Sequence, residues 1–129
     1  MRSHAETRRG ARRLLQSIVK REDMPIEFPE RDWKNWSRLA PLLLNRFCDS
    51  VVARAAEFSA EGGTGHERYL ALYRFIDESN RKIADVFDNR RRSNALFQIA
   101  AAVSNEIMSF EELASFSEET RERVRVICS

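Results

Sequence analysis

Apolar residues recur at spacings of three and four along most of the chain, which is the pattern of amphipathic helices. The first repeat covers residues 5–22 and includes Leu14, Leu15 and Ile18. A second, longer repeat covers residues 30–58. Each repeat predicts a helix, and the two prolines between them, within residues 23–30, predict an extended connector.

Pro41 interrupts the longer repeat. A proline inside a helix removes one hydrogen bond, whereas a proline in the first turn of a helix removes none. The sequence therefore leaves two arrangements open. Either one helix bends at Pro41, or a short helix ends near Leu39 and a new helix begins with Pro41. We prefer the second arrangement because it is simpler.

The next helix follows a glycine-rich loop. Thr64 and Glu67 have the spacing of a capping box, so this helix is expected over residues 65–88. Its apolar side carries Tyr69, Leu72, Tyr73 and Ile76 among other residues, and its opposite side carries charges of alternating sign four residues apart.

The remaining third of the chain predicts three more helices. A stripe that extends to Ile107 and Met108 indicates a fourth helix after residue 89. Ser109 with Glu112 forms a second capping box that opens a short helix, and Ser117 opens the last helix.

Composition agrees with this pattern. The chain has 129 residues with only four Gly and three Pro, too few turn residues for a β sandwich or barrel. The predicted fold is all-α, a small helical bundle of about four main helices plus short C-terminal helices. We expect residues 1–22 to form a basic amphipathic N-terminal helix or arm, and residues 23–129 to form a single helical-bundle domain.

Charge is distributed unevenly. Residues 1–21 carry seven basic residues against one acidic residue, a charge of +6, and the rest of the chain sums to −4. Arginines on a helix face contact phosphates, anionic surfaces or acidic protein faces. The arginines of the arm that are candidates for such contacts are Arg8, Arg9, Arg12 and Arg13.

A second basic cluster, Arg90, Arg91 and Arg92, lies at the start of the predicted fourth helix. Positive charges in a first helical turn oppose the helix dipole, so a compensating anion is expected nearby. The candidates are Asp85, Asp88 and the carboxylate of a partner. The cluster is either solvated or binds an anion.

Two apolar groups are candidates for a protein interface. Leu14, Leu15 and Ile18 lie on one stripe that packs either on the chain's own core or on a partner. Trp33 and Trp36 lie between charged neighbours at a helix start, and tryptophan is enriched in the residues that dominate interfaces. These tryptophans either close the end of the bundle, which we prefer, or contact a partner.

No constellation of residues indicates catalysis. His4 and His66 have no second ligand at metal-binding spacing, and Cys48 and Cys128 match no zinc motif. We therefore expect no metal, no cofactor and no enzymatic activity. The two cysteines are too few for a disulfide framework, and no apolar run is long enough to span a membrane, which predicts a cytoplasmic protein.

The leading hypothesis is a helical protein that binds another protein or a second copy of itself. Its apolar stripes on five helical segments exceed what one core of this size needs. The first alternative is a nucleic-acid-binding or regulatory protein that uses the basic arm. The second is a small-ligand binder or enzyme in the bundle interior, built from Tyr69, Tyr73, Arg74 or Asn80.

Overall fold

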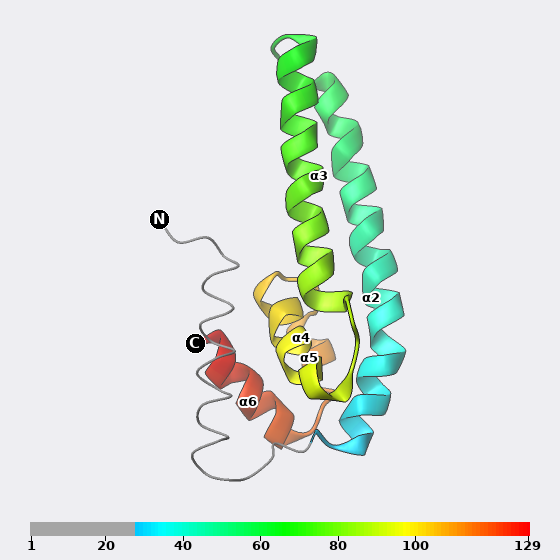
Figure 1. Cartoon of the computed structure of the whole chain (residues 1–129), viewed down its shortest axis with the longest axis vertical. Helices are drawn as coiled ribbons and strands as arrows, with labels where there is room; N and C mark the ends of the chain where they lie inside the picture. The colour runs from blue at the N-terminus through cyan, green and yellow to red at the C-terminus, as the bar shows by residue number, and fades with distance from the viewer. Residues whose placement is uncertain (1–27) are drawn as a thin grey trace.

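A computed structural model describes residues 28–129, and Figure 1 shows the arrangement of the helices. Helix α2 (Glu30–Glu57) and helix α3 (Gly65–Phe87) form a long antiparallel hairpin. The other helical elements are η1 (Phe58–Ala60), α4 (Arg92–Ser104), α5 (Phe110–Leu113) and α6 (Glu118–Cys128). Helices and turns account for these residues without a strand, and the all-α prediction is confirmed for the described part of the chain.

Helix α2 is continuous through Pro41, and the break near Leu39 that we preferred from the sequence is wrong. Because the proline ring has no N–H, the carbonyl oxygen of Ser37 loses its usual helical donor. The guanidinium of Arg90 takes that place, with its Nη1 3.2 Å from the Ser37 oxygen. A hydrogen bond from a distant part of the chain therefore replaces the one that Pro41 cannot make.

Local contacts close the tip of the hairpin. Thr64 and Glu67 form the predicted capping box, in which the Glu67 N–H donates to Thr64 Oγ1 at 3.1 Å. Below the tip, the ring centroids of Phe58 and Phe75 lie 5.4 Å apart. Gly63, in the connecting loop, has a φ of +100°, a backbone conformation that residues with a Cβ rarely adopt.

The end of α4 differs from the sequence prediction, because the helix stops at Ser104 and does not reach Ile107 and Met108. Glu106 has a φ of 59°, in the left-handed region, and reverses the chain. The N–H groups of Ile107 and Met108 both donate to the carbonyl oxygen of Ala102, at 2.8 and 3.1 Å. A chain reversal, and not a further helical turn, brings the two side chains into the core.

The predicted starts of the last two helices are confirmed. Ser109 Oγ accepts a hydrogen bond from the Glu112 N–H, and the Glu112 side chain accepts one from the Ser109 N–H. Ser117 Oγ accepts one from the Thr120 N–H at 3.3 Å. Each serine satisfies an N–H group that the first turn of a helix leaves without a partner.

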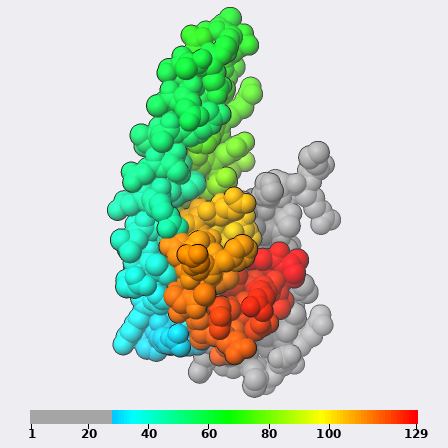
Figure 2. Space-filling view, turned by 180° about the vertical axis from the view of Figure 1, so that it is seen from behind, coloured from blue at the N-terminus to red at the C-terminus, as the bar shows by residue number. Residues whose placement is uncertain are grey.

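The hydrophobic core lies at the lower end of the hairpin in Figure 1, which is the end formed by the start of α2 and the end of α3. There α4 packs against α2, α3 and α6. The largest of its fully buried side chains are Trp36, Phe116, Leu43 and Ile99. Burial falls sharply toward the tip, and between residues 44 and 85 only Phe58 and Ser79 are buried. The lower part is thus a packed cluster of helices, and the upper part is a two-helix hairpin that projects from it (Figure 2).

Candidate interaction surface

Three polar contacts join the base of the hairpin to the rest of the fold. The first is made by Asp32, a buried carboxylate in the first turn of α2. Asp32 is fully buried and accepts three hydrogen bonds from the start of α6. Its Oδ1 accepts from the Ser117 N–H at 2.9 Å, and its Oδ2 accepts from the hydroxyls of Ser117 and Thr120 at 2.5 and 2.6 Å. The negative charge lies at the positive end of α6, where the helix dipole favours it.

A second polar contact joins the middle of α2 to the chain after α4. Both terminal nitrogens of Arg46 bond to the carboxylate of Glu112, at 3.0 and 2.7 Å, and Nη2 also donates to the Ile107 carbonyl oxygen at 2.6 Å. This contact, aided by the Ser109 N–H, lowers the pKa of Glu112 to about 2. The same hydrogen bond to Glu112 raises the pKa of Arg46.

Trp36 makes the third connection, from inside the core. Its indole N–H donates to Gln98 Oε1 at 3.3 Å, and the Gln98 amide donates to the Asp88 carbonyl oxygen at 2.6 Å. Its ring stacks on Phe87 with centroids 6.5 Å apart. Trp36 has no exposed surface and Trp33 is half-buried, so within this fold Trp36 belongs to the core and has no surface to offer a partner.

The arginine cluster at residues 90–92 lies against the first turns of α2. Arg90 donates to Ser37, as described above, and Arg92 forms an ion pair with Glu30 and lies 5.9 Å from the Trp33 ring centroid. Glu30, which was not among the expected anions, is therefore the carboxylate that pairs with Arg92. Two of the three guanidinium groups are engaged in holding the α3–α4 connection against α2.

The upper hairpin exposes apolar side chains. Tyr69, Tyr73 and Ile76 have 63%, 62% and 36% of their surface exposed. Their spacing of four and three residues places them on consecutive turns of one face of α3. We call these three residues the tyrosine stripe. On α2, Val52 is also 69% exposed.

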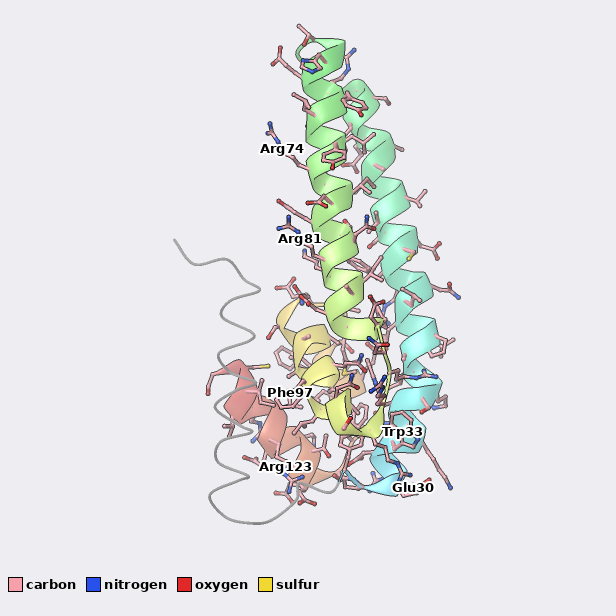
Figure 3. The ribbon with its side chains drawn as sticks, in the orientation of Figure 1. Glu30, Trp33, Arg74, Arg81, Phe97 and Arg123 are labelled. Carbon is pink, nitrogen blue, oxygen red and sulfur yellow. The ribbon has the colours of Figure 1, made fainter. Side chains whose placement is uncertain are left out.

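The tyrosine stripe is bordered by a charged side of α3. Arg74 and Arg81 point away from α2 (Figure 3), and Arg81 pairs with Asp77 at 3.0 Å. This alternation of charges is the solvated face that the sequence predicts. Helix α3 therefore has one side with charged side chains and another side on which two tyrosine rings are exposed to solvent.

Sequence reasoning did not find this surface, because it assigned Tyr69, Tyr73 and Ile76 to the apolar side of the third helix without identifying what covers them. A signal was present in the residue type. Tyrosine keeps a polar hydroxyl at the end of an apolar ring and is common at protein surfaces that bind partners. The hydrophobic period alone does not distinguish a covered stripe from an uncovered one.

Several predicted contact residues lie outside the described residues. They are Arg8, Arg9, Arg12, Arg13, Leu14, Leu15 and Ile18. Within residues 28–129, no helix has the length and apolar content required to cross a membrane, and no three His, Cys, Asp or Glu side chains gather as metal ligands would. No protein-family model, no curated protein and no solved structure matches this chain.

Proposed function

We propose that the protein acts by binding another protein, or a second copy of itself, through the tyrosine stripe of the projecting hairpin. One observation carries this proposal: Tyr69, Tyr73 and Ile76 are exposed on a hairpin that the other described helices contact at its base. Exposed apolar patches on folded proteins mark interaction sites.

Covering this surface would contribute to the free energy of a specific contact. Covering the exposed part of each tyrosine ring removes on the order of 100 Å² from water, which is worth about 2–3 kcal/mol before the costs of association. Tyrosine also loses little rotational freedom when it is bound, since it has only two side-chain torsions. A complementary partner surface is apolar at its centre and polar at its edge.

The proposal describes a non-enzymatic protein that needs no cofactor. We further propose a cytoplasmic location, because both cysteines, Cys48 and Cys128, are free thiols and suit a reducing compartment. A second copy of the chain and a different protein are both compatible occupants of the stripe, and light scattering distinguishes them.

The test compares three forms of the full chain: wild type, Tyr69→Ser with Tyr73→Ser, and the matched control Arg74→Ser with Glu78→Ser. Both double variants change two exposed residues four apart, on neighbouring turns of α3. Each form is analysed by size exclusion with light scattering, and then by quantitative affinity purification from cells that produce it. Circular dichroism checks that the helical content is unchanged.

We expect self-association, or the yield of a copurifying protein, to fall at least tenfold in the tyrosine variant and to stay within twofold in the control. Equal mass and equal copurification in all three forms would overturn the proposal. Loss in both double variants alike would also count against it, because the effect would then not belong to the tyrosine stripe.

A further inference from the structure

A cavity of about 390 Å³ lies between α4, α5 and α6, and no residue of the tyrosine stripe lines it. Its walls are mainly apolar and include Val103, Phe110, Leu113 and Val124. The volume is within the range of about 300–1,000 Å³ that is typical of small-molecule sites. The cavity is half-open, and its size and lining suit an apolar molecule that remains partly in solvent.

Arg121 gives this cavity a specific polar group. Its Nε is buried and has no hydrogen-bond partner among the described residues. The neighbouring arginines of α6 differ, since Arg123 pairs with Glu119 and Arg125 pairs with Glu122. A buried donor on a charged group is costly without an acceptor. Arg121 is one of the residues that line the cavity, so an acceptor bound there can reach its guanidinium.

We propose that this cavity binds a monocarboxylate with an apolar body, such as a medium-chain fatty acid, whose carboxylate pairs with Arg121. The guanidinium presents Nε–H and one terminal N–H side by side, and two parallel donors match the two oxygens of a carboxylate. The apolar body then lies against the aliphatic and aromatic walls. This site is independent of the proposed protein contact on the hairpin.

The charge of α6 favours a single negative charge on the ligand. Arg123 and Arg125 are already matched by carboxylates of the same helix. Arg121 is left as the one cation at the cavity without a carboxylate from the described residues. A dianionic phosphate would bring a second negative charge to the cavity, and the other lining arginine, Arg125, is already paired with Glu122.

Phe110 supports an apolar body on the ligand. It lines the cavity at the start of α5, and 82% of its surface is exposed. A phenyl ring so exposed beside an apolar cavity gains burial when a molecule fills the space below it. The carboxylate and the apolar body thus each have a counterpart in this site.

The experiment titrates the full chain with decanoate, 1-decanol and decyl phosphate below their aggregation concentrations. The readout is the ¹⁵N resonance of the Arg121 Nε–H, which reports directly on the proposed contact. We expect saturable shifts with decanoate, at least tenfold weaker binding of decanol, and binding of decyl phosphate that is no tighter than that of decanoate. Equal affinity for decanol, or no shift with decanoate, would overturn the proposal, and tighter binding of decyl phosphate would overturn the carboxylate assignment.

Two variants complete the test. Arg121→Met removes the unpaired donor and keeps an apolar side chain, so it is expected to fold with an unchanged or higher melting temperature and to bind decanoate at least tenfold more weakly. Arg74→Met, on the hairpin, is the matched control and should bind as wild type. Unchanged decanoate binding in Arg121→Met contradicts the proposal.

Cys128 supplies a second measurement, because it also lines the cavity and is exposed. In a Cys48→Ser background Cys128 is the one remaining thiol of the chain. We expect decanoate to slow maleimide labelling of Cys128 several-fold, and Arg121→Met to remove this protection. Labelling that is insensitive to decanoate counts against occupation of the cavity.

Discussion

The lower and upper parts of the α2/α3 hairpin contain similar helices but are held by different contacts. In the lower part, Asp32, Trp36 and Arg46 bond to groups that lie 61 to 88 residues away in the sequence. In the upper part, the ion pairs and caps join residues that are close in sequence, such as Arg81 with Asp77 and Thr64 with Glu67.

This difference assigns two properties to two parts of one hairpin. The lower part stabilises the fold, and the upper part has surface available for binding. Long-range contacts and a multi-helix core make the lower part dependent on the whole fold. The upper part has few buried side chains, so its opening free energy is expected to be lower than that of the core. An interaction surface on the upper part can therefore change without loss of the fold.

The largest effect that tests this comparison is expected at Asp32. Asp32→Ala leaves the Ser117 N–H and two hydroxyl groups of α6 without their acceptor, in a site that water does not reach. We expect a loss of about 3–4 kcal/mol in the free energy of unfolding, measured by urea denaturation. Asp49→Ala, at an exposed position of the same helix, should change it by less than about 0.5 kcal/mol. Similar losses of unfolding free energy in both variants would contradict the conclusion that Asp32 joins α2 to α6.

A pair of leucines compares the two parts directly. Leu43 in the lower part is 1% exposed, whereas Leu72 in the upper part is only half-buried. We expect Leu43→Ala to cost about 3 kcal/mol and Leu72→Ala about 1 kcal/mol, because truncation leaves a cavity only where neighbours surround the side chain. Native-state hydrogen exchange measures both. Leu72→Ala should speed exchange in the hairpin tip and leave α4 unchanged, and a uniform increase would show that the two parts open together.

The ion pair of Arg46 with Glu112 gives a smaller, pH-dependent effect. Because the pKa of Glu112 is lowered to about 2, its contribution to stability is present above pH 4.5 and is lost as the pH falls toward 2. Arg46 is 56% exposed, so we expect solvent screening to reduce this contribution to about 1 kcal/mol. Glu112→Gln should remove this part of the acid sensitivity in urea titrations between pH 5 and pH 2. Glu78→Gln is the control, and an identical pH profile for the two variants would contradict the assignment.

The features predicted from sequence were those decided by neighbouring residues. The capping boxes at Thr64 and Ser109 and the start of α6 at Ser117 depend on a hydroxyl and an N–H three residues apart, and these were predicted correctly. The all-α class follows from the helical period and the scarcity of glycine and proline. Local hydrogen bonds and periodicity are thus legible without knowledge of the fold.

The features that were missed depend on residues far apart in the chain. Nothing near Asp32 in the sequence indicates that its carboxylate accepts hydrogen bonds from Ser117 and Thr120. Likewise, nothing near Arg121 indicates that its Nε–H lacks an acceptor. The tyrosine stripe has the same period as a core stripe. It is exposed because no further helix among residues 28–129 covers the upper hairpin. Tertiary placement, and not residue type, determines each of these features.

The smallest predicted effect concerns the continuity of α2 through Pro41. If Arg90 serves mainly to bond the Ser37 oxygen that Pro41 leaves free, the two residues are coupled. We expect Arg90→Met to cost about 1 kcal/mol in the wild-type background and less than about 0.3 kcal/mol in a Pro41→Ala background, where the alanine N–H supplies the missing bond. Arg91→Met, one residue away, should cost little in both backgrounds. A double-mutant cycle from urea denaturation measures the coupling. Equal costs of Arg90→Met in the two backgrounds would show that Arg90 stabilises the α3–α4 connection through other contacts. The continuity of α2 through Pro41 would then not depend on the hydrogen bond from Arg90 to Ser37.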